Sequence, residues 1–150
     1  MLFKVSIAII SEKSIFVQQD QLLMTEQLPL PYQQGLHILC EAFTESTEPL
    51  LQYQTLKQKW AEWIQELGLE QVGEVFHDFP TGGFTGVICL TESHISIHTW
   101  PEYNYFTFDV FLSNYRRKND DKGEKLLNDT LELLGVTKSN ITKAYRYWHF

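Results

Sequence analysis

A polar segment at residues 91–103 lies between two short apolar runs, and this placement constrains the fold more than any other feature of the chain. The runs, residues 86–90 and 105–112, are rich in β-branched and aromatic side chains and are as short as strands usually are. In the second run the even-numbered residues should share one face and the odd-numbered residues, continued by Ser113, the other. The sequence therefore predicts polar, chemically capable side chains held on a sheet.

Ser93 is the side chain of this segment that could act as a nucleophile, and it would need a base beside it. His94 and His98 could each be that base, although the strand period of two places Ser93 and His98 on opposite faces unless the chain bends between them. The alternative is that His94, Ser96 and His98 are only the polar face of an edge strand. No metal site is expected, because two histidines four residues apart bind a metal from a helix and not from strand-like sequence.

Residues 92–103 read Glu-Ser-His-Ile-Ser-Ile-His-Thr-Trp-Pro-Glu-Tyr. This run resembles the self-processing site of the bacterial and archaeal S-adenosylmethionine decarboxylases, which are small pyruvoyl enzymes of spermidine biosynthesis. By this resemblance the protein cuts its own chain between Glu92 and Ser93, and Ser93 becomes a pyruvoyl group that serves as the cofactor. The expected activity is the decarboxylation of a small-molecule substrate, S-adenosylmethionine, in polyamine biosynthesis.

The resemblance also assigns roles in self-cleavage. The Ser93 hydroxyl would attack the Glu92 carbonyl to form an ester, and His98 would then remove the α-proton of residue 93. Thr85 lies eight positions before the cleaved serine, where the family has a serine, and it would hold the oxyanion or hydrogen-bond the rearranging carbonyl. The cut would separate residues 1–92 from residues 93–150.

Ser113 stands where the family has the cysteine that returns a proton to the substrate after carbon dioxide leaves. A thiol titrates near about pH 8.5 and an alcohol is a far weaker acid, so Ser113 alone is expected to protonate the carbanion slowly. Cys89 is a conceivable replacement. With Thr85, this departure keeps two alternatives open: a pyruvoyl decarboxylase of another amino acid such as ornithine or arginine, or an uncleaved homologue that binds or regulates.

Three further residues are candidates for substrate binding. Glu102 matches a family carboxylate that binds the ribose hydroxyls of the substrate. Phe79 and Trp100 are near enough to the segment in sequence to stack on the substrate or form a wall of the site. For both aromatic side chains, packing in the core is the alternative.

The order of elements after residue 34 predicts an α+β fold, a two-layer α/β sandwich whose largely antiparallel sheet has helices on one face. A hydroxyl at Ser46 or Thr47 and the proline at 49 predict the start of the first helix, and Gly68 its end. The other expected elements are strands at 35–43, 70–79 and 140–150, a glycine-rich connection at 80–86 and a second helix at 122–134, which ends at Gly135.

Residues 1–34 are expected to be an N-terminal extension with a strand at residues 2–10, and residues 35–150 the decarboxylase-like domain. The sheet face without helices needs a cover. The resemblance implies that two protomers cover it for each other, as a homodimer.

The net charge of −7 argues against a nucleic-acid surface, and residues 116–118, Arg-Arg-Lys, read as solvated residues of a turn. Cys40 and Cys89 lie in apolar runs and are expected to be free, buried thiols of a cytoplasmic protein. No apolar run approaches the roughly twenty residues needed to cross a bilayer, so no membrane association is expected.

Overall fold

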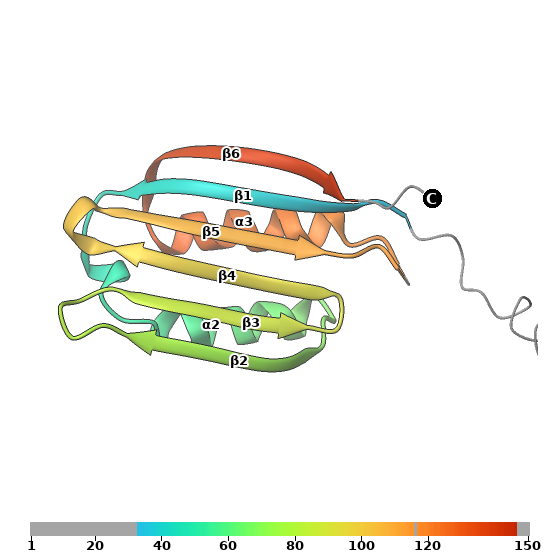
Figure 1. Ribbon diagram of the computed structural model, residues 1–150, viewed down its shortest axis with the longest axis horizontal. Coiled ribbons are helices and arrows are strands. Elements are labelled where there is room, and N and C mark those ends of the chain that lie inside the picture. The colour runs from blue at the N-terminus through green and yellow to red at the C-terminus, as the bar shows by residue number, and fades with distance from the viewer. Residues whose placement is uncertain (1–32, 116, 147–150) are drawn as a thin grey trace, which may run out of the picture. The chain divides into compact units, whose positions relative to one another are not determined.

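Six strands form one sheet in the order β2-β3-β4-β5-β1-β6, and every neighbouring pair is antiparallel (Figure 1). The computed structural model describes residues 33–115 and 117–146. The strands are β1 (Gly35–Thr44), β2 (Gln71–Asp78), β3 (Phe84–Leu90), β4 (Ser93–Trp100), β5 (Tyr105–Leu112) and β6 (Val136–Arg146), and the helices are α2 (Gln54–Glu66) and α3 (Asp120–Leu133).

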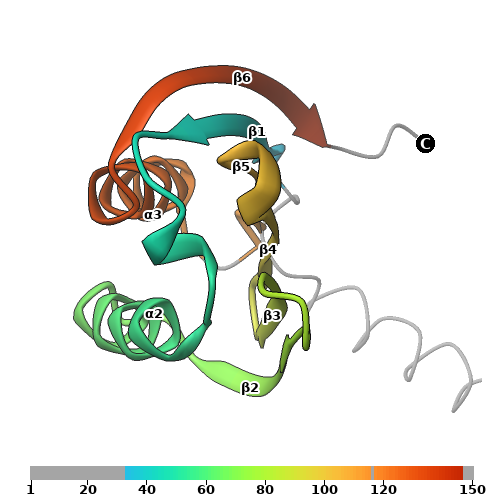
Figure 2. The same ribbon diagram turned by 90° about the vertical axis from the view of Figure 1, so that its left-hand side faces the viewer.

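Both helices pack on the same face of the sheet, so the predicted two-layer α+β sandwich is confirmed (Figure 2). The alternation predicted for residues 105–112 is confirmed as well, because Phe106, Phe108, Val110 and Leu112 are buried under the helices. Trp60 of α2 is fully buried, and its indole N–H donates to Thr130 Oγ1 of α3 at 3.0 Å. This hydrogen bond joins the two helices above the sheet.

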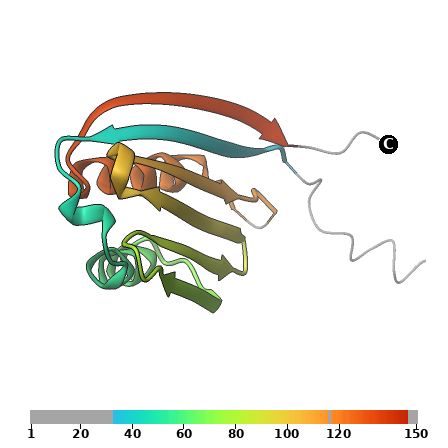
Figure 3. The ribbon, with the colours of Figure 1, turned by 60° about the vertical axis from the view of Figure 1, so that its left-hand side comes forward.

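The opposite face of the sheet is not covered by either helix, as the turned view shows (Figure 3). Several large apolar side chains on this face remain open to solvent: Leu39 is 38% exposed, Phe43 41% and Trp100 38%. His94, Ser96 and His98 of β4 lie between the buried positions Ile95, Ile97 and Thr99, as the strand period predicted. The candidate polar side chains of β4 therefore belong to the helix-free face.

The predicted start of the first helix was wrong. Glu48–Leu50 form a separate 3-10 turn, η1, and Thr47 makes no side-chain capping bond. Helix α2 begins at Gln54, where the backbone N–H of Tyr53 donates to Asp78 Oδ1 at 3.1 Å. The cap comes from a strand that lies 25 residues further along the chain, and a local sequence pattern cannot reveal such a partner.

Other boundaries agree more closely. Gly68 and Gly135 both take positive φ angles, 61° and 64°, directly after the two helices, as predicted for helix ends. The last strand begins at Val136, four residues earlier than predicted, and the strand predicted at residues 2–10 lies outside the described residues. Neither of the described helices has the length and apolar character to span a membrane.

Candidate active site

A tight connection joins β3 to β4 and contains only Thr91 and Glu92, so that Ser93 pairs with Leu90 at the first position of β4. Ser93 has a φ of 147°, a conformation that costs a residue with a Cβ about 1–3 kcal/mol and persists only where its surroundings hold it. The strained residue forms one half of the Glu92–Ser93 bond. The sequence resemblance marks this bond for cleavage.

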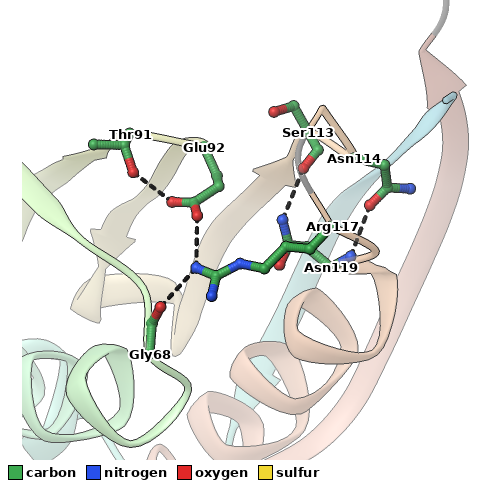
Figure 4. Close-up of polar contacts among 7 residues, drawn as sticks. All are labelled: Gly68, Thr91, Glu92, Ser113, Asn114, Arg117 and Asn119. Carbon is green, nitrogen blue, oxygen red and sulfur yellow. Dashed lines mark hydrogen bonds and ion pairs between the residues drawn. The ribbon is translucent and has the colours of Figure 1, made fainter. Parts of the chain in front are cut away.

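The Glu92 carbonyl oxygen has a fixed hydrogen-bond donor, the backbone N–H of Ser113, at 2.8 Å. Such a donor polarises a carbonyl and stabilises the negative charge that develops on its oxygen during nucleophilic attack. The loop that supplies the donor is itself held, because Asn119 Nδ2 donates to the Ser113 carbonyl at 2.8 Å (Figure 4). The contact with Glu92 uses the backbone of Ser113 and does not depend on its side chain.

The Ser93 hydroxyl has a histidine beside it, but this histidine is His94. Ser93 Oγ lies 3.1 Å from His94 Nδ1, within reach of proton transfer. The His94 ring meets the His37 ring edge to face, with 6.0 Å between the centroids. Burial, with a contribution from the nearby Arg146 charge, lowers the pKa of His37 below its ordinary value. His37 therefore remains neutral at lower pH than an ordinary histidine.

Arg117 contacts the same turn, and the sequence reading missed it by treating residues 116–118 as solvated. Its Nη2 atom donates to Glu92 Oε1 at 2.7 Å and to the Gly68 carbonyl at 2.6 Å (Figure 4). The partner lies 25 residues away in sequence, and a basic residue in a polar loop carries no local signal of such a contact. The side chain therefore belongs to the candidate site.

A second group of predicted residues gathers at the other end of β4. Thr85 Oγ1 lies 2.7 Å from His98 Nδ1, and the two residues pair directly across β3 and β4. Trp100 follows with its ring centroid 6.4 Å from that of His98, and Glu102 is exposed in the adjoining 3-10 turn, η2 (Pro101–Tyr103). Phe79, 43% exposed, begins the β2–β3 connection, and its backbone N–H donates to the Gly83 carbonyl at 2.8 Å.

The predicted site residues thus form two groups within one chain. Glu92, Ser93 and Ser113 lie at the start of β4, and the group around His98 lies at its end. His98 lies five positions after Ser93 along β4, which corresponds to roughly 16 Å at about 3.3 Å per residue. The histidine that directly contacts the Ser93 hydroxyl is not the one that the resemblance assigns to proton removal.

Cys40 is buried as predicted, but the prediction for Cys89 was wrong, because Cys89 is exposed. The apolar run 86–90 alternates in burial, and Cys89 occupies one of its helix-free positions, directly across from His94. Burial, together with the charges of Glu41 and Asp109, raises the pKa of the Cys40 thiol to about 11. Within residues 33–115 and 117–146 no three histidine, cysteine, aspartate or glutamate residues are arranged to hold a metal ion.

The geometry defines an α+β sandwich protein with a strained Glu-Ser turn at one end of a central strand and a Thr-His pair at the other. The sequence pattern of the family described as "S-adenosylmethionine decarboxylase" matches residues 36–147. That match covers most of the chain. The chain therefore belongs to the S-adenosylmethionine decarboxylase family.

Individual relatives agree with this assignment. An S-adenosylmethionine decarboxylase proenzyme of Persephonella marina is 36% identical over 93 residues, which cover 62% of this chain and 70% of the relative. A proenzyme of the same name from Archaeoglobus fulgidus is 35% identical over 51% of this chain and 69% of its own. The crystal structure of the adenosylmethionine decarboxylase from Aquifex aeolicus VF5 shares the fold, with a TM-score of 0.69, 23% identity, and coverage of 81% of this chain and 96% of that one.

Proposed function

We propose that this protein cleaves its own chain between Glu92 and Ser93 and then decarboxylates S-adenosylmethionine with the resulting pyruvoyl group, as a cytoplasmic homodimer in polyamine biosynthesis. The observation that carries the proposal is the Glu92–Ser93 turn. A strained serine follows a carbonyl that already accepts a backbone hydrogen bond, and its hydroxyl lies beside an imidazole. The relatives that match are named proenzymes of this decarboxylase, which favours this substrate over ornithine or arginine.

The first step of self-cleavage uses groups at the start of β4. His94 accepts the proton of the Ser93 hydroxyl, whose oxygen attacks the Glu92 carbonyl carbon while the Ser113 N–H holds the carbonyl oxygen. The peptide bond breaks as an ester forms, and the former amide nitrogen becomes the free amine of residue 93. This nitrogen takes up the proton.

The second step removes the α-proton of residue 93, and the bond between its Cβ and the ester oxygen breaks. Glu92 leaves as a carboxylate that keeps the former serine oxygen, and residue 93 becomes dehydroalanine. One water is then added and one ammonia released, which yields the pyruvoyl group. The residues present fit the formation of a pyruvoyl group from Ser93, because the Ser113 N–H already holds the backbone of the turn at Glu92.

The pyruvoyl group supplies an electron sink for the decarboxylation, the work that a pyridoxal ring performs elsewhere. The protein's own residues bind the substrate and return a proton to it. Glu102 would bind the ribose hydroxyls, Phe79 and Trp100 would contact the flat or apolar parts of the substrate, and Ser113 occupies the position of the proton donor. All three substrate-binding candidates are exposed, and the Trp100 ring lies beside that of His98.

A homodimer would unite the two groups. His98 lies roughly 16 Å from Ser93 along β4, too far for it to take the α-proton of residue 93 in the same chain. Stacking the helix-free faces of two copies about 10 Å apart, with a two-fold axis between the sheets, perpendicular to β4 and level with its middle, would place Ser93 of one copy opposite His98 of the partner subunit. The same contact would cover Leu39, Phe43 and Trp100.

An intact mass spectrum under denaturing conditions tests the self-cleavage. Two fragments that divide at Glu92, the second of which gains the mass of a hydrazone on treatment with phenylhydrazine, are expected, together with carbon dioxide release from carboxyl-labelled S-adenosylmethionine. Ser93→Ala is the uncleaved control. One full-length mass after long incubation overturns the proposal and leaves the uncleaved binding homologue.

Mixed dimers test the shared site. Ser93→Ala and His98→Ala chains, distinguished by tags, should each remain intact when made alone. When they are made together, the His98→Ala chain should be cut, because its own Ser93 meets His98 of the partner subunit. Failure of the mixture, with both single variants folded and dimeric, contradicts the shared arrangement and leaves self-cleavage itself unaffected.

A further inference from the structure

The Glu92 side chain has hydrogen-bond donors on both carboxylate oxygens. Thr91 Oγ1 donates to Oε2 at 2.6 Å, and Arg117 Nη2 donates to Oε1 at 2.7 Å (Figure 4). The Glu92 side chain is 17% exposed, whereas Arg117 is 44% exposed. A charge-assisted pair with one partly buried member keeps more of its strength than a pair in open water.

The ionised form of Glu92 is favoured by these contacts. Burial raises the pKa of its carboxyl, but the hydrogen bonds from Thr91 and Arg117 and the guanidinium charge together outweigh burial and hold the pKa below its ordinary value. The carboxylate therefore remains charged and paired at neutral pH.

Arg117 is anchored on its other side as well. The same Nη2 atom donates to the Gly68 carbonyl at 2.6 Å, just beyond the end of α2, where unpaired carbonyl groups favour a cation. One side chain thus ties the β3–β4 turn to the end of a helix and to the loop after β5. Thr91 adds a backbone contact between its N–H and the Glu70 carbonyl, at 2.9 Å.

The loop that carries Arg117 also carries the donor to the Glu92 carbonyl. Ser113 contacts the backbone of Glu92, and Arg117 contacts its side chain. The loop is braced by the Asn119 N–H, which donates to Asn114 Oδ1 at 2.7 Å, and by Asn114 Nδ2, which donates to Asp120 Oδ1 at 2.8 Å. One loop therefore holds both the carbonyl and the carboxylate of Glu92, the residue directly before the strained Ser93.

We propose that Arg117 is a positioning residue for self-cleavage: by holding the Glu92 carboxylate, it keeps the Glu92 carbonyl on the Ser113 N–H and facing the Ser93 hydroxyl. This inference rests on the proposed self-cleavage. Arg117 touches neither reacting atom and acts through Glu92. Misplacement of a reacting carbonyl by about 1 Å can lower the rate a hundredfold, so a residue that only positions Glu92 can have a large effect on cleavage.

The test measures the rate of cleavage in chains made by cell-free synthesis, quenched in denaturant at intervals and resolved by mass spectrometry. Arg117→Met should slow cleavage by about ten- to hundredfold, the range expected for loss of a hydrogen bond to a charged group. Arg117→Lys should recover part of the rate. Lys118→Met, which removes a neighbouring charge that takes part in none of the described ion pairs, should cleave as the unchanged chain does.

A double-variant cycle separates positioning from a general loss of stability. Glu92→Met, which removes both carboxylate oxygens, should slow cleavage, and adding Arg117→Met to it should slow cleavage little further, because the pair is already broken. The inference is overturned if the fold reduction in cleavage rate of the double variant equals the product of the reductions of the two single variants. It is also overturned if Arg117→Met and Lys118→Met cleave at equal rates. If the unchanged chain never cleaves, the proposed self-cleavage is wrong and this inference is wrong with it. If the unchanged chain cleaves and Arg117→Met cleaves at the same rate, only this inference is wrong.

Discussion

Gly86 of β3 lies under the ring of Phe76 on the neighbouring strand, and replacing it should create a measurable clash. A Cβ at this position would meet the Cδ1 and Cε1 atoms of Phe76 far inside van der Waals contact. The ring cannot retreat freely, because its centroid lies 5.1 Å from that of Tyr53 and 6.1 Å from that of Trp60. Phe76 and Gly86 are also paired in the sheet, so their backbones are fixed side by side.

Two opposing effects determine how much Gly86→Ala changes the free energy of unfolding. Overpacking a filled site costs about 1–3 kcal/mol. An alanine in place of a glycine with compatible backbone angles returns about 0.4–1 kcal/mol, because the unfolded chain loses freedom. Gly73 of β2 is a matched control, since a Cβ there meets nothing within 4 Å. Gly86→Ala should therefore be less stable than Gly73→Ala by about 1–3 kcal/mol, or roughly 2–12 °C in Tm.

The free energy of unfolding should be measured in a Ser93→Ala background, which keeps the chain in one piece and the unfolding reversible. Urea titration followed by tryptophan fluorescence suits this region, because Trp60 packs against Phe76. If both alanine variants unfold at the same urea concentration with the same slope, Phe76 is not wedged against Gly86 and the packing argument is refuted. A change confined to the slope would point to the unfolded state.

Three further outcomes are expected. Ser113→Cys should raise the rate of decarboxylation in single-turnover assays and leave self-cleavage unchanged, because the contact with Glu92 uses the backbone N–H of Ser113; a slower cleavage would contradict this division. At pH 8 iodoacetamide should alkylate exposed Cys89 and spare Cys40, whose pKa is raised to about 11, as peptide mapping can check. Residues 1–92 and 93–150 should co-elute in native gel filtration after cleavage and separate only in denaturant, because β1 lies between β5 and β6 and β3 pairs with β4.

Patterns within one element predicted most of the fold. The alternation of residues 105–112 indicated which side chains of β5 are buried, and Gly68 and Gly135 marked the helix ends. These signals arise from contacts that repeat every two residues or from the backbone of one residue. The start of α2 depends instead on Asp78, and Cys89 is exposed because no helix covers its face of the sheet. Neither fact is present in the residues nearby.

The candidate site shows the same limit in a different way. Residues 92–103 are continuous in sequence and match one family motif, yet most of them form the extended strand β4, whose two ends lie beside two separate groups of polar side chains. Continuity in sequence therefore says nothing about proximity in a strand, where about 3.3 Å separates each residue from the next. The Ser93 hydroxyl contacts its sequence neighbour His94, but Glu92 is held by Ser113 and Arg117, which are distant in sequence. In the proposed dimer a second copy of β4 supplies the remaining partner. The motif identifies the residues that carry the reactive groups. The tertiary contacts and the proposed dimer determine which of those residues come into contact.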